Sequence, residues 1–177
     1  PDKDKCEAIW ELSLKKRILS AERRGIYGVE QINKSAGKLI RDYGAKKFTD
    51  RYFPGEFLMI TKNQAMYKLY NGDTGIVVYK DSTPYIMLRK ASENETGFVF
   101  YPLSWFPTEA IEPAFAITIH KSQGSEYDHV TMFLPKQEGH PLLNNQILYT
   151  GITRAKQSVT IIATPETFKA ACETVIE

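Results

Sequence analysis

One segment of the chain concentrates side chains that bind phosphates and sugars. Residues 116–128 read Ala-Ile-Thr-Ile-His-Lys-Ser-Gln-Gly-Ser-Glu-Tyr-Asp, so an apolar element leads into polar and glycine residues and then into a second strand. Gly124 allows a ligand to approach the backbone closely because it has no Cβ. The Glu126 carboxylate can accept a hydrogen bond from a ribose hydroxyl. The simpler alternative is a satisfied polar loop that only connects two core elements.

A second segment places one arginine between a helix and a strand. Residues 146–156 read Gln-Ile-Leu-Tyr-Thr-Gly-Ile-Thr-Arg-Ala-Lys, so Arg154 follows an apolar helical stretch and stands close to the next strand. A guanidinium is a rigid fork of donors, and this geometry suits a phosphate group that is being transferred. The alternative is an arginine at a helix C-terminus that only complements the helix dipole.

Alternating helix and strand patterns must position these two segments. On the N-terminal side, the patterns predict a helix over 6–15, a strand over 17–21 and a helix over 29–43 that Gly44 ends. On the C-terminal side, they predict strands over 129–134 and 158–163. Alternation of this kind indicates a mostly parallel sheet.

Two further helical patterns belong to the C-terminal part. Between the last two strands, one helical face is predicted to carry Leu148, Ile152 and Ala155. Thr164 and Pro165 then predict a helix start, with threonine as the N-cap and proline in the first turn. The side chains predicted to face inward from that last helix are Phe168, Cys172 and Val175.

The middle of the chain is richer in Val, Ile, Tyr and Phe, with turn residues between short apolar runs. We predict a strand in each of four segments, which are 55–62, 74–80, 84–90 and 97–103. Asn71-Gly72-Asp73 supplies turn residues that tolerate positive φ. Four such strands indicate a small antiparallel barrel or sheet. The predicted fold class is therefore α/β, with residues 1–53 and 111–177 forming one discontinuous domain around an inserted β module at 54–110.

Composition limits the classes of function. The chain has 177 residues and 42% hydrophobic residues, enough for one ordinary domain or two small ones with a real core. Because the net charge is only +2, any basic surface must be local. Cys6 and Cys172 stand far apart, and the histidines have no ligand partners at metal spacing, so no disulfide framework or metal site is predicted.

The same features suggest where the protein resides. Few cysteines and no signal peptide fit a reducing cytoplasm, and no apolar stretch approaches the roughly 18 residues of a membrane span. No membrane partner is therefore expected. Because the first residue is Pro1, we expect a domain cut from a larger protein.

Together, the segments around 118–128 and 148–155 resemble motifs V and VI of superfamily-one helicases. They are most similar to the RecD family, the alpha subunit of exodeoxyribonuclease V and its standalone relatives, which travel 5′ to 3′ on DNA. Leu69–Gly75 is similar to a Phe-Asn-Gly-Asp-x-Gly segment of that family, with Tyr70 in place of Phe, and Ile18–Asn33 is similar to its motif IV region. The resemblance implies a RecA-like, P-loop-NTPase-type second lobe, called domain 2A, with an inserted Src-homology-3-like barrel, called domain 2B.

The resemblance also implies roles for single residues. Arg154 matches the motif VI arginine that reaches the γ-phosphate, and Arg23 is a candidate second phosphate arginine, with Arg24 as its competitor. Gly124 and Glu126 match positions beside the nucleotide. The implied contacts on the single-stranded DNA side, with Gln123 coupling the two sides of the loop, are Thr118, His120, Ser122 and, in the barrel, Asn71. The barrel aromatics that are candidates for stacking on bases are Tyr67, Tyr70, Tyr85, Phe100 and Trp105, and the simpler alternative for most of them is a place in the core or an interface.

The chain does not contain a complete ATP site. Its only Gly-Lys pair, Gly37-Lys38, is followed by leucine inside a predicted helix, and no Asp-Glu pair exists to hold magnesium. By resemblance, ATP and Mg²⁺ bind mainly to a first RecA-like lobe that precedes this segment. The implied partners are that lobe, single-stranded or forked DNA, and other subunits of an exodeoxyribonuclease V complex. The isolated fragment is expected to be inactive.

Three other functions compete with a helicase lobe. A single-stranded nucleic-acid-binding module without ATPase activity fits the same polar segments. A nuclease subunit is less well supported, because the sequence shows no cluster of Asp, Glu and Lys that would hold its metals. A different phosphotransfer enzyme with an arginine finger is disfavoured by the missing P-loop.

Overall fold

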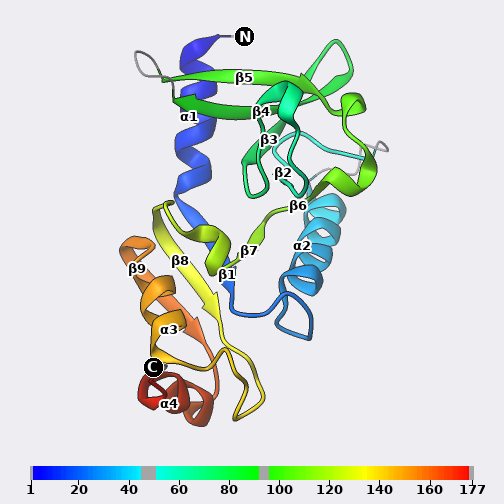
Figure 1. Cartoon of the computed structure of the whole chain (residues 1–177). Coiled ribbons are helices and arrows are strands. Elements are labelled where there is room, and N and C mark those ends of the chain that lie inside the picture. The colour runs from blue at the N-terminus through cyan, green and yellow to red at the C-terminus, as the bar shows by residue number, and fades with distance from the viewer. Residues whose placement is uncertain (1, 45–50, 92–95, 176–177) are drawn as a thin grey trace. The chain divides into compact units, whose positions relative to one another are not determined.

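The computed structural model describes residues 2–44, 51–91 and 96–175, and the chain divides into two compact units (Figure 1). The antiparallel unit comprises the described residues of Pro1–Cys6 and Ser35–Phe115, and the parallel unit comprises those of Glu7–Lys34 and Ala116–Glu177. Helix α1 (Lys3–Leu14) and helix α2 (Val29–Tyr43) each contribute residues to both units. The assignment of residues 54–110 to an inserted domain stays a prediction.

The parallel unit is built on a four-stranded sheet in the order β7-β1-β8-β9. All neighbouring strands are parallel, which confirms the predicted sheet type. The strands are β1 (Lys16–Ser20), β7 (Ala116–Thr118), β8 (Tyr127–Phe133) and β9 (Ala155–Ile162). Val130, Met132 and Leu134, predicted on one face of the β8 segment, are all buried. A one-turn 3₁₀ helix, η4 (His120–Ser122), lies between β7 and β8.

Helix α3 (Asn145–Ile152) contacts β8 and β9. Asn144 caps its N-terminus by accepting a hydrogen bond from the backbone N–H of Ile147 at 3.0 Å. The prediction that Ala155 belongs to this helix is wrong, because Ala155 already pairs with Tyr127 in the β8–β9 ladder. Arg154 therefore occupies the short connection between the helix and the strand.

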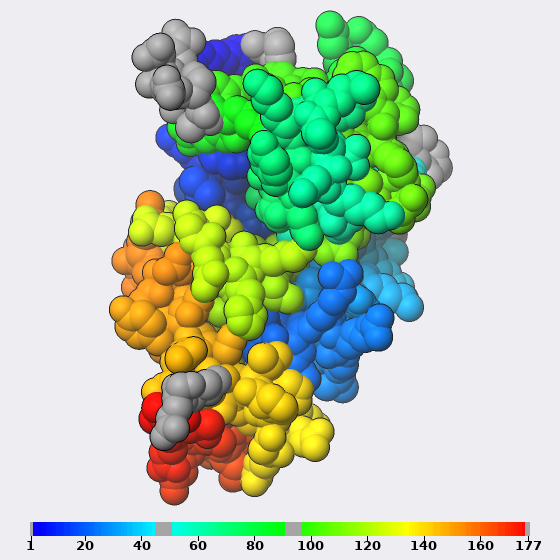
Figure 2. Space-filling model, in the orientation of Figure 1, coloured from blue at the N-terminus to red at the C-terminus, as the bar shows by residue number. Residues whose placement is uncertain are grey.

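Helix α4 (Pro165–Glu173) packs against α3, and the red and orange surfaces of the two helices adjoin in Figure 2. The predicted N-cap is confirmed, since Thr164 and Thr167 form a reciprocal capping box. The predicted inward face is wrong. Thr167 and Ala171 are buried, whereas Phe168 is 40% exposed and Val175 lies beyond the end of the helix. Tertiary packing places Thr167 and Ala171 on the inner face of the helix, so Phe168 and Cys172, one position later, face solvent.

The antiparallel unit contains a five-stranded sheet in the order β5-β4-β3-β2-β6. The four predicted strands are confirmed as β2 (Phe57–Ile60), β3 (Thr74–Lys80), β4 (Thr83–Ala91) and β5 (Thr96–Pro102). The sequence pattern missed β6 (Ile111–Pro113), which pairs with β2 and is too short to show alternation. Three 3₁₀ turns complete the unit: η1 (Ala65–Tyr67), η2 (Leu103–Trp105) and η3 (Thr108–Ala110).

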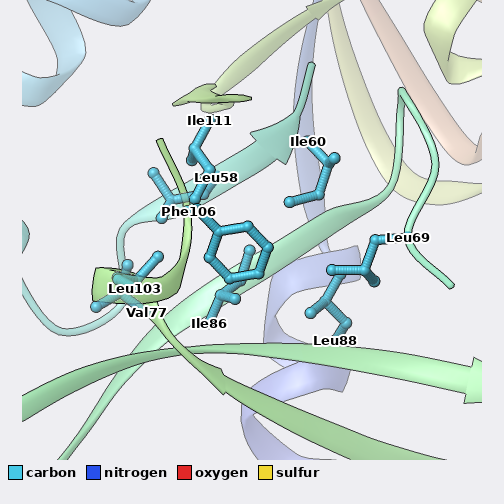
Figure 3. Close-up of a cluster of buried hydrophobic side chains, with 9 residues drawn as sticks. All are labelled: Leu58, Ile60, Leu69, Val77, Ile86, Leu88, Leu103, Phe106 and Ile111. Atoms are coloured by element: carbon cyan, nitrogen blue, oxygen red, sulfur yellow. The ribbon is translucent and has the colours of Figure 1, made fainter. Parts of the chain in front are cut away.

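A compact core holds the antiparallel sheet and its 3₁₀ turns together. Figure 3 shows nine buried side chains that converge from the strands and from the segment around η2. They are Leu58, Ile60, Leu69, Val77, Ile86, Leu88, Leu103, Phe106 and Ile111. The predicted turn at Asn71–Asp73 borders this core, with Gly72 at φ 104° and its N–H donating to Ile60 O at 2.8 Å.

A buried carboxyl group lies beside the first strand of this sheet. Glu56 is 6% exposed, and its Oε2 accepts a hydrogen bond from the Phe53 N–H at 3.1 Å. Burial raises the pKa of Glu56 above its ordinary value, although the Phe53 bond and the charges of Arg41 and Arg51 act in the opposite direction.

This shift predicts a pH-dependent stability. Between the ordinary and the raised pKa of Glu56, the unfolded chain releases a proton that the folded chain keeps, so the free energy of unfolding falls as pH rises through that range. Glu56→Gln removes the ionisation and can still accept the Phe53 bond. We expect it to increase the free energy of urea unfolding at neutral pH and to match the wild type below the ordinary carboxyl pKa. A variant that is less stable at neutral pH would contradict this expectation.

Candidate nucleotide and nucleic-acid site

The guanidinium of Arg154 is held by the two segments that carry the predicted chemistry. Its Nε donates to Thr150 O at 3.1 Å, and its Nη2 donates to Thr153 Oγ1 at 3.1 Å. Its Nη1 donates to Ser125 O at 3.4 Å, which joins the arginine to the polar loop before β8. These bonds use three of the five N–H donors of a guanidinium, and the side chain is half-buried, so donors remain for a phosphate.

The backbone reinforces this connection. The N–H of Tyr127 donates to Arg154 O at 2.8 Å, at the point where β8 and β9 begin to pair. Beside it, Lys156 Nζ lies 3.4 Å from Glu126 Oε2, and both side chains are more than half exposed. An exposed ion pair of this kind contributes little stability. It leaves the Glu126 carboxylate at the surface next to the arginine, where a ribose hydroxyl can reach it.

The loop between β7 and β8 runs from the edge of the parallel sheet at which the strands end to the opposite edge, at which the strands begin. Thr118 ends β7 level with Ser20, the last residue of β1. Tyr127 begins β8 level with Ala155, the first residue of β9. Since a seven-residue strand spans roughly 20 Å, the ends of this loop lie at opposite edges of the sheet. Thr118 and His120 therefore lie at the carboxyl edge, and Glu126 and Arg154 lie at the amino edge.

At the carboxyl edge, the three predicted DNA contacts are not equivalent. Thr118 is half-buried and its hydroxyl accepts a hydrogen bond from the Lys121 N–H at 3.4 Å, while His120 is exposed. Ser122 is fully buried, and its hydroxyl donates to Ile119 O at 2.6 Å. In this conformation Ser122 stabilises the η4 turn, and its side chain does not reach the surface.

In the crossing itself, Gln123 and Gly124 are both exposed. Gly124 has a φ of +82°, a conformation that side chains with a Cβ rarely adopt, and the space where a Cβ would stand is open. The backbone there is therefore accessible to a ligand, as the sequence suggests. Ser125 N donates back to Ser122 O at 3.0 Å, which closes the turn around Gln123 and Gly124.

The structure does not bring Arg23 to Arg154. Arg23 follows the carboxyl end of β1, whereas Arg154 precedes the amino end of β9, and the strands between these edges are parallel. Arg23 Nε lies 3.0 Å from Glu30 Oε1 in the first turn of α2, and Arg24 Nε lies 3.9 Å from the same oxygen. The family resemblance suggested Arg23 as a second phosphate arginine, but it carries no information on which edge of the sheet each loop occupies.

Two residues that support this site are absent from the sequence-based list. The side chain of Asn33 on α2 pairs with Ala116 at the start of β7, donating to its O at 3.0 Å and accepting from its N–H at 2.7 Å. Gly28 is the second, since a Cβ there would stand 2.5 Å from the backbone carbon of Arg24. Asn33 and Gly28 occur in the segment that resembles motif IV. This resemblance was the only feature of the sequence that pointed to them.

The remaining predicted DNA contacts belong to the antiparallel unit. Asn71 is exposed in the β2–β3 turn, and its N–H donates to Asn63 Oδ1 at 2.8 Å. Trp105 stacks on Tyr67 with ring centroids 5.5 Å apart and is 54% exposed. Tyr70 is 59% exposed. Tyr67 packs against the core, so Trp105 and Tyr70 are the candidates for contact with a base.

Clusters of metal ligands and membrane-spanning helices are both missing from the described part of the chain. No group of three or more His, Cys, Asp or Glu residues there is arranged to hold a metal ion. None of the helices described is both long and apolar enough to cross a membrane.

The comparison with protein families covers the segments just described. Residues 113–162, which include the crossing loop, α3 and Arg154, match the model for the UvrD-like helicase C-terminal domain. This segment is a UvrD-like helicase C-terminal domain. The helicase domain thus contains both Glu126 and Arg154, and the contacts between these two segments are contacts within it.

Curated relatives extend the similarity beyond the helicase domain. The chain is 33% identical over 170 residues to the RecBCD enzyme subunit RecD of Mycolicibacterium smegmatis, covering 96% of this chain and 29% of the relative. It is 35% identical over 160 residues to the RecD subunit of Haemophilus influenzae, covering 88% of this chain and 22% of that protein. The predicted resemblance to the RecD family is confirmed. The chain spans less than a third of the length of these relatives.

Solved structures support the fold. A crystal structure of Pif1 helicase from Bacteroides, in complex with ADP-AlF3 and ssDNA, matches with a TM-score of 0.52 at 15% identity. The match covers 99% of this chain and 48% of the Pif1 chain. The mixed α/β architecture with a parallel sheet is therefore consistent with a RecA-like helicase lobe, whereas closure of the antiparallel unit into a barrel stays a prediction.

Proposed function

We propose that this chain is the C-terminal motor lobe of an ATP-dependent, RecD-like DNA helicase that acts in DNA unwinding and recombinational repair. In this proposal, residues 1–53 and 111–177 form domain 2A, and residues 54–110 form an inserted Src-homology-3-like barrel, domain 2B. The observation that carries it is the hydrogen bond between Arg154 Nη1 and Ser125 O, together with the Tyr127–Arg154 backbone bond. These contacts hold a phosphate-binding side chain against the loop that crosses the sheet.

On the nucleotide side, Arg154 acts as the arginine finger. Its remaining N–H donors face the γ-phosphate from across a cleft and stabilise the charge that develops during transfer. Glu126 and the exposed backbone at Gly124 contact the ribose side of the nucleotide. The described residues provide no metal cluster, so the proposal assigns Mg²⁺ and most of the ATP contacts to an N-terminal RecA-like lobe of the same protein.

On the DNA side, Thr118 and His120 contact the backbone of a single strand. Both stand at the carboxyl edge of the sheet, and the crossing loop joins them to Glu126 at the amino edge. We propose that this loop couples the nucleotide contacts to the DNA contacts, with Gln123 at its exposed turn. A movement of the loop when the nucleotide cleft closes then shifts the DNA contacts. Arg23 shares the carboxyl edge and is better placed for DNA phosphates than for the γ-phosphate.

The antiparallel unit supplies a second DNA contact. Asn71 is exposed in its turn, and the free faces of Trp105 and Tyr70 are available to stack on bases. Direction of travel, 5′ to 3′, and a place in a bacterial cytoplasmic exodeoxyribonuclease V complex come from the similarity to RecD subunits. The second candidate function, a single-stranded nucleic-acid-binding module without ATPase activity, is favoured by the absence of a P-loop in the sequence.

The full-length protein and the 177-residue chain should behave differently. We expect the full-length protein to hydrolyse ATP only in the presence of single-stranded DNA, and to unwind forks that carry a 5′ single-stranded arm. The isolated chain should bind single-stranded DNA weakly, with an affinity that falls with salt, and should hydrolyse no ATP. Steady-state ATPase and strand-displacement assays test this. DNA binding without ATP turnover in the full-length protein would favour the binding-module function.

A further inference from the structure

A buried arginine contacts Tyr127, the residue whose backbone N–H bonds to Arg154 O. Arg17 stands on β1 near the amino edge of the parallel sheet and is only 5% exposed. Its Cζ lies 5.0 Å from the centroid of the Tyr127 ring. A buried guanidinium needs compensating partners, and the face of an aromatic ring is one of them.

The charge of Arg17 persists despite its burial. Removal from water lowers the pKa of Arg17 from its ordinary value, while the interaction with Tyr127 raises it. A guanidinium starts so far above neutral pH that it stays protonated in proteins. The contact with Tyr127 therefore combines a cation at the ring face with a side-chain hydrogen bond in a desolvated site, where such contacts are stronger than at the surface.

Tyr127 connects this cation to the arginine finger. Its side chain is 3% exposed, so the ring is fixed by its surroundings. Its N–H donates to Arg154 O at 2.8 Å, and the residue two positions before it, Ser125, accepts from Arg154 Nη1 at 3.4 Å. A shift of the ring therefore moves both backbone groups that hold Arg154.

We propose that Arg17 is a positioning residue for Arg154, which acts by clamping the Tyr127 ring at the start of β8. This inference rests on the proposed role of Arg154 as the arginine finger. Loss of the clamp leaves the nucleotide contacts in place but lets the guanidinium of Arg154 leave the geometry needed for transfer. Misplacement of the Arg154 guanidinium lowers the rate of phosphoryl transfer more than it lowers the affinity for ATP.

The test uses the full-length protein and single-stranded-DNA-stimulated ATP hydrolysis. Arg17→Met, which keeps the length of the side chain but not the charge, should lower kcat by about 10- to 100-fold and leave KM for ATP within about twofold. Arg17→Lys should restore part of kcat, because an ammonium also binds a ring face. Lys16→Met, on the exposed neighbouring position, is the control for loss of a positive charge and should leave kcat unchanged.

A double-mutant cycle separates positioning from a general structural role. In an Arg154→Ala background, Arg17→Met should cause no further loss of kcat, because there is no finger left to position. An equal loss in both backgrounds would overturn the proposal, as would an unchanged kcat in Arg17→Met. If Arg17→Met fails to fold, as judged by thermal unfolding, the same cycle with Arg17→Lys decides. Near wild-type turnover of Arg154→Ala alone would refute the arginine-finger role itself.

Discussion

Replacing Arg154 by alanine in the full-length protein is expected to lower ATP turnover by ~10³-fold or more while ATP still binds. The guanidinium contributes charge where it develops during transfer, and alanine contributes none. ATP binding should persist because the proposal assigns the triphosphate and Mg²⁺ to the other lobe. Single-turnover hydrolysis and binding of a fluorescent ATP analogue measure the two quantities separately.

A second substitution tests whether the loss of any positive charge lowers ATP turnover. Lys169→Ala also removes one positive charge, but its side chain on α4 is 73% exposed and its Nζ lies 3.9 Å from Glu173 Oε1, so we expect turnover close to wild type. Thermal unfolding of both variants should coincide with that of the parent protein within a few degrees. If Arg154→Ala stays within a few-fold of wild-type turnover, the arginine-finger assignment is wrong.

A glycine in the loop before α2 should be the most sensitive backbone position in the parallel unit. In Gly28→Ala, the new Cβ would lie 2.5 Å from Arg24 C and 2.8 Å from Arg23 O, so backbone atoms must move. Forced movement in a packed region costs about 1–3 kcal/mol, and backbone neighbours favour the upper end of that range. Urea unfolding of the 177-residue chain measures the loss.

The control for Gly28 is another glycine of the same segment of chain. Gly37 lies inside α2, and nothing stands within 4 Å of the position its Cβ would occupy. Gly37→Ala is therefore expected to increase the free energy of unfolding by about 0.4–1 kcal/mol, since alanine loses less conformational freedom on folding. Equal effects of the two substitutions would contradict the steric explanation for Gly28.

Local patterns predicted the elements well because their causes are local. Thr164 and Pro165 mark the start of α4, and the cluster of Ile, Val and Tyr residues over 74–80 coincides with β3. The predicted inward face of α4 was wrong because tertiary packing sets the rotation of a helix about its axis, and residue spacing alone does not. The three residues of β6 are too few to show any period.

The two segments of the candidate site could be singled out in the sequence, but their arrangement could not. The spacing around Arg154 and Glu126 identified two segments, and the structure brings them together at one edge of the sheet. Which edge each loop occupies depends on strand order, so the separation of Arg23 from Arg154 was not visible. The burial of Ser122 was equally hidden, since a serine in a polar loop has the same sequence pattern whether it faces the solvent or the interior.

The pairing of β1 with β7 and β8 also sets the order in which the chain can fold during synthesis. Asn33 and Ala116 are separated by 83 positions, and the residues between them form the antiparallel unit. That unit pairs mostly strands that follow one another, so its hairpins can form as soon as they leave the ribosome. β1 is made first, yet its partners are made last, and it waits with its edges unpaired. A pause in translation between residues 34 and 116 would prolong that exposure.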